Sequence, residues 1–117
     1  MKFFEKANEL YKNQNFKDAI DFYKKSYLFE DNKSSSLYNQ GVCHIKLKEY
    51  EDAIPCLKKA IELKKESKYY FNLGYAYAML NTKDKALIYF NLAWSYDNND
   101  KDCERAINII LKTYKTG

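Results

Sequence analysis

The residue types best suited to chemistry in this chain are its three cysteines and its one histidine. Cys43 and His44 are adjacent, and neighbouring residues on a helix point about 100° apart, which does not suit a nucleophile and its base. The odd cysteine count and wide spacing favour reduced thiols, so we expect Cys43, Cys56 and Cys103 to fill contacts between helices. We expect His44 to pack in the core. The sequence therefore predicts no catalytic residue, no metal ligand and no cofactor.

The composition predicts one domain spanning residues 1–117. Of these residues 46 % are hydrophobic and 17 % aromatic, which is enough for a core. The 20 basic residues exceed the 16 acidic ones by four, and the lysines are scattered among acids instead of forming a block. No apolar run reaches the length of a signal peptide or a membrane span. We therefore expect a cytoplasmic protein that does not bind nucleic acid and does not insert into a membrane.

Three stretches of the chain superpose without a gap: "KANELYKNQNFKDAIDFYKKS", "QGVCHIKLKEYEDAIPCLKKA" and "LGYAYAMLNTKDKALIYFNLA". Small residues recur at three aligned places, namely Ala7, Gly41 and Gly74, then Ala19, Ala53 and Ala86, then Ser26, Ala60 and Ala93. Small residues in two consecutive helices let their backbones approach closely. Because Pro and Gly are rare here, helices joined by short polar turns must fill the chain. Each unit is therefore predicted to be a helical hairpin.

The third unit resembles the tetratricopeptide repeat, whose signature is W-x2-L-G-x2-Y, then A-x3-F, then P. The matching residues are Tyr70, Leu73, Gly74, Tyr77, Ala86 and Phe90, with Tyr in place of Trp and Asn98 in place of Pro. The second unit has Leu37, Gln40, Gly41 and His44 in the first part of the signature, and the first unit diverges most. The resemblance implies an all-α fold, a right-handed α-solenoid of three antiparallel helical hairpins, with repeats at about residues 1–33, 34–66 and 67–100.

The segment at residues 101–114 predicts a seventh helix without a partner. Its apolar residues recur at helical spacing: Cys103, Ala106, Ile107, Ile110, Leu111 and Tyr114. A terminal helix of this kind covers the apolar side of the last repeat and keeps an array soluble. We therefore expect a capping helix here.

The first helix of the third unit lies in "YYFNLGYAYAML", residues 69–80, and its angular positions divide into two stripes. The stripe that the hairpin needs for packing consists of Tyr70, Leu73, Gly74 and Tyr77. A second stripe, which the hairpin does not need, consists of Phe71, Tyr75, Ala78 and Met79, with Asn72 beside it. When hairpins stack with a small constant rotation, their first helices line a concave surface. The second stripes of the three units should then align as one groove.

We predict that this groove binds a peptide segment of a partner protein. Its predicted residues are Phe4, Asn8, Tyr11, Tyr38, Asn39, Val42, Lys46, Lys68, Phe71, Asn72, Tyr75, Met79 and Arg105. The resemblance implies that Asn39 and Asn72 hold the backbone amide of a bound peptide, since one Asn side chain both donates and accepts. Lys46, Lys68 and Arg105 favour an acidic ligand.

Some members of the resembled family bind the C-terminus of chaperones through a carboxylate clamp of cationic and Asn residues. Asn8, Asn39 and Lys68 match that clamp, but Phe4 and Asn72 replace two of its cations, which disfavours a chaperone tail as the ligand. The alternative reading is a structural or self-associating repeat domain without a peptide ligand. We expect a monomer under the first reading and a homodimer that buries Phe71 and Tyr75 under the second.

Overall fold

The structure, a computed structural model, describes residues 2–116, with side chains as far as residue 113. In this range it contains seven α-helices and no strand, which confirms the predicted all-α helical repeat. The helices are α1 (Phe3–Lys12), α2 (Phe16–Phe29), α3 (Lys33–Lys46), α4 (Tyr50–Leu63), α5 (Ser67–Met79), α6 (Lys83–Tyr96) and α7 (Lys101–Thr116). Tyr114, which we expected on the apolar face of the capping helix, lies outside the residues whose side chains are described.

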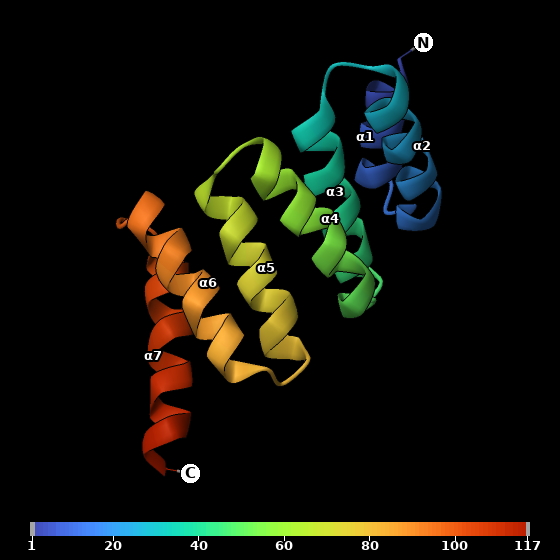
Figure 1. Cartoon of the computed structure of the whole chain (residues 1–117). Coiled ribbons are helices and arrows are strands. Elements are labelled where there is room, and N and C mark those ends of the chain that lie inside the picture. Colours follow the sequence, from blue (N-terminus) through green and yellow to red (C-terminus); the bar gives the residue numbers. More distant parts are fainter. Residues whose placement is uncertain (1, 117) are drawn as a thin grey trace.

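The helices form an elongated stack of 52 × 25 × 21 Å, with α1 and α7 at opposite ends (Figure 1). Each helix packs mainly on the next one in the sequence, and α3 also touches α5. The core is therefore divided along the stack. One cluster of buried side chains, which we call the N-terminal core, is built around Ala7, Ala19, Ile20, Tyr23 and Cys43. A second, the C-terminal core, is built around Ala53, Leu57, Leu73, Tyr77, Ala86, Phe90 and Ile110.

Small residues close the hairpins at the predicted places. A Cβ atom added to Gly41 would lie 2.8 Å from Cγ of Leu57, and one added to Gly74 would lie 2.8 Å from Cδ1 of Phe90. The facing Ala53 and Ala86 are completely buried at 0 % exposure. The glycines thus let the two helices of a hairpin approach so closely that a larger side chain at either position has no space.

The three turns within the hairpins share one backbone geometry. Gln14, Lys48 and Asn81 have φ angles of 62°, 61° and 60°, so each turn contains one residue in the left-handed region. The next residue in each turn donates its N–H to a carbonyl near the end of the preceding helix, with N–O distances of 2.8, 2.8 and 2.9 Å. The repeated sequence therefore produces a repeated turn as well as repeated helices.

In the first hairpin, the carboxylate of Glu30 connects the end of α2 to the start of α1. Glu30, just after α2, accepts hydrogen bonds from the backbone N–H groups of Phe3 at 2.7 Å and Phe4 at 3.0 Å. It also accepts one from the Ser26 hydroxyl at 3.1 Å, and Ser36 donates to Ser26 at 2.9 Å. Glu30 thus satisfies N–H groups that the start of α1 leaves without a helical partner, and places negative charge at that helix's positive end.

We expect Glu30→Gln to lower the melting temperature at pH 7 and to have progressively less effect in acid. Desolvation alone would raise the pKa of Glu30, but hydrogen bonds from Phe4, Phe3 and Ser26 hold that pKa below its ordinary value of 4.5. A carboxyl whose pKa is lower in the folded state stabilises the fold above its unfolded pKa and loses this effect as the pH falls through the folded value. Thermal melts of both proteins between pH 7 and pH 3 measure the difference. A gap in melting temperature that stays constant over this range would contradict the assignment.

The last helix, α7, packs on α6, with Cys103 at 0 % and Ile110 at 7 % exposure. Its first turn is capped by Asp100, which accepts hydrogen bonds from the N–H groups of Asp102 at 2.9 Å and Cys103 at 3.3 Å. None of the helices between residues 2 and 116 is both long and apolar enough to cross a membrane.

Candidate peptide-binding face

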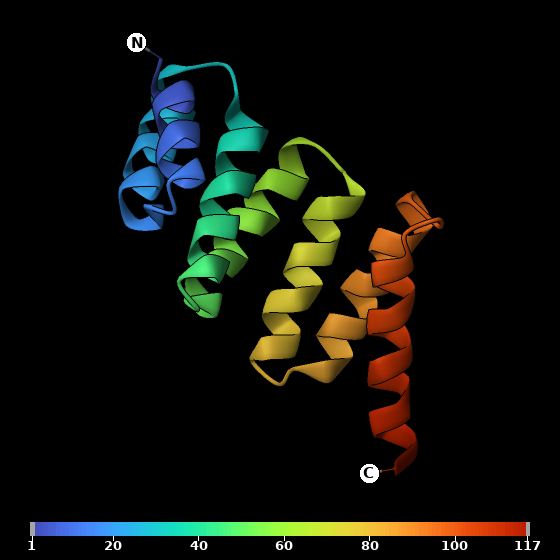
Figure 2. The same ribbon diagram turned by 180° about the vertical axis from the view of Figure 1, so that it is seen from behind.

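The two stripes predicted on α5 differ in burial as expected. Tyr70, Leu73 and Tyr77 are 6 %, 0 % and 6 % exposed, so this stripe is core. Tyr75 and Met79 are 38 % and 48 % exposed. The first helices of the three hairpins, α1, α3 and α5, lie on the side of the stack that faces the reader in Figure 2.

A pocket of about 440 Å³ lies on this side, and we call it the α3/α5 pocket. Its lining residues are Tyr11, Val42, Ile45, Lys46, Lys48, Tyr50, Phe71, Asn72 and Tyr75. Side chains from α1, α3 and α5 thus meet here, most of them from the predicted groove. Ile45, which lies on the α3 stripe, was left out of the predicted list. Lys48 and Tyr50 were missed because they lie at the α3–α4 turn, outside the helical stripes. Both residues could have been found from the predicted turn, because that turn begins where the α3 stripe ends.

A second pocket, the α1 pocket, adjoins the first through Tyr11, which lines both. It measures about 550 Å³ and is lined by Glu5, Asn8, Glu9, Tyr11 and Lys12. The two pockets differ in charge: two lysines and no acid line the α3/α5 pocket, whereas two acids and one lysine line the α1 pocket. Together they offer an extended surface that is basic at one end and acidic at the other.

The asparagines of this face already make hydrogen bonds within the chain. Asn72 Nδ2 donates to the Tyr38 hydroxyl at 3.0 Å and to the Lys68 carbonyl at 2.9 Å. The Tyr23 hydroxyl donates to Asn8 Oδ1 at 2.6 Å. Burial raises the pKa of Tyr23, and the nearby, partly buried Asn39 side chain opposes this. To bind a peptide carbonyl, Asn72 must therefore exchange one of these internal hydrogen bonds. The peptide-binding role inferred for Asn39 and Asn72 stays a prediction.

Two predicted groove aromatics line neither pocket and pack between helices instead. Tyr38 stacks on Tyr69 of the next unit with ring centroids 4.6 Å apart, and Phe4 meets Tyr23 edge-on at 5.8 Å. Burial, with smaller contributions from Tyr11, Tyr69 and Glu66, raises the pKa of Tyr38 to about 12, so its hydroxyl is protonated at neutral pH. These rings connect neighbouring helices and fix the positions of the residues that do line the pockets.

The remaining predicted residues lie on α5 and α7, outside the linings of both pockets. Lys68 Nζ sits 5.3 Å from the centre of the Tyr38 ring, and Met79 is exposed near the end of α5. Arg105, on α7, donates to Asp102 at 2.7 Å, an exposed pair of the kind that contributes little to stability. Met79, Lys68 and Arg105 line neither the α3/α5 pocket nor the α1 pocket.

The structure gives His44 a partner that the sequence analysis missed. His44 Nδ1 lies 2.9 Å from Glu49 Oε1, which joins the end of α3 to the start of α4, and His44 is only partly buried. Asp52 brings a third potential ligand atom within 4.8 Å of the other two. The expectation of a core histidine is therefore wrong in part, because the α3–α4 turn brings Glu49 back onto the ring. All three cysteines are buried free thiols, and burial raises the pKa of Cys43 to about 12.

The family assignment follows from comparison with known proteins. Family models described as tetratricopeptide repeat match residues 34–67 and residues 67–100, which together make up more than half of the chain. The chain therefore belongs to the tetratricopeptide repeat family.

Among curated relatives, the mitochondrial import receptor subunit TOM34 of Rattus norvegicus is 39 % identical over 59 residues, covering 50 % of this chain and 19 % of that protein. The Hsp70/Hsp90 co-chaperone CNS1 of Saccharomyces cerevisiae is 37 % identical over 89 residues, covering 72 % of this chain and 23 % of that protein. The chain thus spans about a fifth of the length of these relatives. The solved structure of the first TPR of Spaghetti (RPAP3) bound to HSP90 peptide SRMEEVD superposes with a TM-score of 0.91 at 20 % identity, covering 97 % of this chain and 90 % of that one.

Proposed function

We propose that this chain is a protein–protein interaction module that binds a peptide segment of a partner protein along the α3/α5 pocket and the α1 pocket. Residues 1–117 act as one domain, with three repeats and a capping helix, and the domain catalyses no reaction. The observation that carries the proposal is the meeting of Val42, Phe71 and Tyr75, from successive repeats, beside Lys46 and Lys48 in one pocket. Apolar walls with a few polar groups are what a peptide side chain and its flanking backbone need.

The charge of the pockets supports a segment with acidic residues near the α3/α5 pocket. Lys46 and Lys48 attract a carboxylate there, while Glu5 and Glu9 in the α1 pocket favour a cationic or neutral continuation. Similarity to a co-chaperone and an import receptor subunit supports a protein as the partner. We propose that the domain works in the cytoplasm as a monomer.

A terminal carboxylate is not the main determinant of binding in this proposal. Phe4 occupies a clamp position without a charge, and its backbone N–H is held by Glu30 at 3.0 Å. Asn72 occupies another and bonds to Tyr38. The peptide SRMEEVD and its C-terminally amidated form are therefore expected to bind with affinities within about threefold of one another, because the charge-assisted hydrogen bonds of a full clamp are missing. Isothermal titration calorimetry of both peptides measures the two affinities. A loss of affinity of more than about tenfold on amidation would favour binding through a carboxylate clamp instead.

The proposal itself is tested by affinity capture from the native extract. The baits are the unaltered domain, a Tyr75→Ala, Lys46→Glu variant of the α3/α5 pocket, and Ile88→Ala as the matched control. Ile88 is an exposed apolar residue, 56 % exposed, on α6. We expect a protein that the parent and Ile88→Ala retain and the pocket variant loses. Equal retention by all three baits would remove the pocket as the binding site, and a concentration-dependent dimer abolished by Tyr75→Ala in light scattering would favour self-association.

A further inference from the structure

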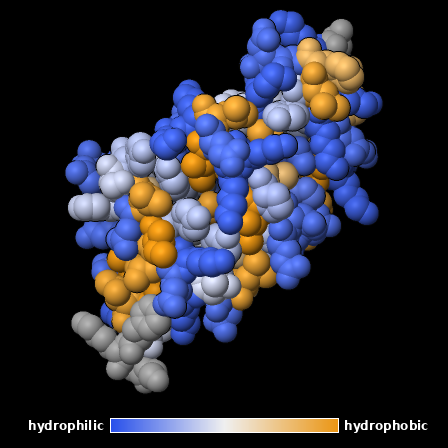
Figure 3. Space-filling model, viewed as in Figure 1, coloured by the Kyte–Doolittle hydropathy of each residue, from blue (hydrophilic) through white to orange (hydrophobic). Residues whose placement is uncertain are grey.

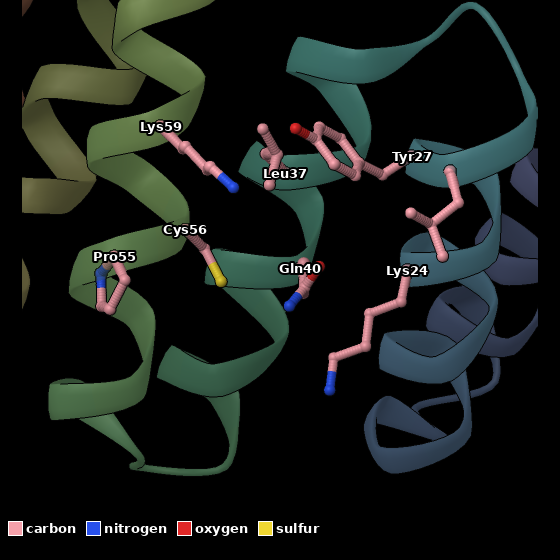
Figure 4. A pocket seen from close by; sticks show the side chains of 8 residues that line it. Lys24, Tyr27, Leu37, Gln40, Pro55, Cys56 and Lys59 are labelled. Carbon is pink, nitrogen blue, oxygen red and sulfur yellow. The ribbon is translucent and has the colours of Figure 1, made fainter.

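A separate pocket of about 350 Å³ lies between α2 and α4, and we call it the α2/α4 pocket (Figure 4). Its lining residues are Lys24, Tyr27, Leu28, Leu37, Gln40, Pro55, Cys56 and Lys59. Residues of α3 form the floor, and α2 and α4 form the walls. Helices α2 and α4 lie toward the reader in Figure 1, and Figure 3 shows apolar strips between hydrophilic side chains on that face. None of its lining residues belongs to the α3/α5 pocket or the α1 pocket.

The repeats show why this space is open. In the gap-free superposition, Gln40 aligns with Leu73 and Cys56 aligns with Tyr89. At the next junction Leu73 is completely buried, and Tyr89 packs with Ile61 against Tyr70 in one cluster. The same place between α2 and α4 therefore has a thiol where the later junction has an aromatic ring. The pocket is a property of these residues and not of the repeat fold in general.

Gln40 gives the pocket a polar group that lacks a partner. The residue is only 8 % exposed, and its side chain makes no hydrogen bond with any residue in the described part of the chain. No fully buried side-chain nitrogen or oxygen in that part lacks a partner, so the amide of Gln40 must reach the space of the pocket. In Figure 4 the amide points into the space between α2 and α4. The amide is thus accessible from the pocket, and a ligand group that both donates and accepts would pair with it in place of solvent.

The rim of the pocket is cationic. Lys24 comes from α2 and Lys59 from α4, and no acid is among the lining residues. Lys59 Nζ lies 5.5 Å from the centre of the Tyr27 ring, which holds it at the edge of the pocket. Burial is the main effect on the pKa of Cys56 and raises it. The positive charges of Lys24 and Lys59 lower this pKa, whereas the negative charge of Asp52 raises it further. Both lysines therefore lie near enough to act on a ligand beside Cys56.

We propose that the α2/α4 pocket is a second docking site, which takes an acidic segment of a partner protein with one apolar side chain inserted. The apolar side chain packs between Tyr27, Leu37 and Pro55. The backbone amide next to it pairs with Gln40, and flanking carboxylates meet Lys24 and Lys59. The argument rests on the unpaired amide and the charge of the rim, and it is independent of the function proposed for the α1, α3 and α5 side.

The test uses the peptide Glu-Asp-Leu-Phe-Glu-Asp, acetylated and amidated so that it has no terminal charge. The readout is the side-chain amide signal of Gln40 in ¹⁵N-labelled protein, observed by NMR. We expect a saturable shift of this signal. A peptide with Ser-Gly in place of Leu-Phe, and one with Lys in place of every acid, should produce no saturable shift. Equal shifts with all three peptides, or none with the first, would overturn the proposal.

Two variants locate the binding, and one control separates the two faces. Cys56→Tyr copies the later junction and is expected to abolish binding by filling the pocket. Lys24→Glu with Lys59→Glu changes only exposed residues and is expected to weaken peptide binding by about tenfold. This double variant tests the proposal even if Cys56→Tyr does not fold. Tyr75→Ala should leave the affinity unchanged. Loss of binding in Tyr75→Ala alone would assign the peptide to the α3/α5 pocket and contradict the proposal.

Two other occupants have distinct signatures. Decanoate, a small apolar carboxylate, would shift the Gln40 signal in the absence of any response to the peptide. A second copy of the chain would shift the signal on concentrating the protein alone. Either result in place of the saturable peptide response would overturn the proposal of an acidic partner segment.

Discussion

Gly74→Leu is expected to destabilise the domain by about 3 kcal/mol, at the upper end of the cost of overpacking a core. Even a Cβ at this position would lie 2.8 Å from an aromatic carbon of Phe90 and 3.2 Å from the backbone oxygen of Ala86. Neither neighbour is the end of a flexible side chain. The helices α5 and α6 must therefore separate to accept the new side chain. Such a loss is a large part of the stability of a small domain.

Gly74→Ala sharpens this test because two effects oppose one another. In a helix interior, Ala is favoured over Gly by about 1 kcal/mol, so propensity alone predicts a gain in stability. The contact with Phe90 predicts a loss instead. Chemical denaturation of Gly74→Ala, Gly74→Leu and the exposed control Met79→Leu should therefore give a graded loss for the first two and little change for the third. A stabilised Gly74→Ala protein would show that the hairpin has more space than its geometry indicates.

Tyr77→Ala is expected to cost about 3–5 kcal/mol, the range for removing a large buried aromatic side chain. The ring is 6 % exposed and lies in the C-terminal core, where it stacks on Tyr89 at 5.6 Å with an interplanar angle of 7°. Its removal leaves a cavity between α5 and α6 that the surrounding backbone can close only in part. A decrease in melting temperature of about 10–20 °C corresponds to this loss.

Tyr77→Phe and Asn72→Ala are the controls for this prediction. Tyr77→Phe keeps the stacked ring and should retain most of the stability. Asn72→Ala removes the hydrogen bond to Tyr38 and is expected to cost about 1 kcal/mol. Equal losses of stability for Tyr77→Ala and Asn72→Ala in thermal melts would contradict the difference in burial between the two stripes of α5.

The helices and most of the core were predictable because the repeat fixes them locally. Small residues at Ala19, Ala53 and Ala86 mark where paired helices cross, and all three are completely buried. Spacing on one helix also separated Tyr77 from Tyr75. Local periodicity is enough here, since each hairpin needs only its own sequence to define which side faces its partner.

Contacts between units were much harder to predict. Tyr69 is only 1 % exposed because it stacks on Tyr38 of the preceding repeat, and neither ring's role follows from the spacing within one helix. The same holds for Glu30, which meets the N–H of Phe3 from 27 residues away, and for Glu49, which returns to His44 across a turn. These pairs depend on how helices are placed in space.

The α2/α4 pocket is indicated in the sequence by differences between the repeats and not by their matching residues. Superposing the units reveals similarity at the small residues, but the pocket arises where the units differ, at Gln40 and Cys56. Departures from the repeat pattern are therefore as informative as matches to it, because Gln40 and Cys56 line a pocket where the later junction is filled.

The division of the core along the stack has a consequence for the kinetics of the chain. Native contacts join segments that are close in sequence, and helical proteins of this kind fold in about microseconds to milliseconds. Parts of such an array open separately as cooperative units, and we expect the N-terminal and C-terminal cores to define two such units. Tyr11 packs against the first core and Phe71 against the second, and both line the α3/α5 pocket. A peptide bound there would hold the two units together and slow amide hydrogen exchange throughout the array.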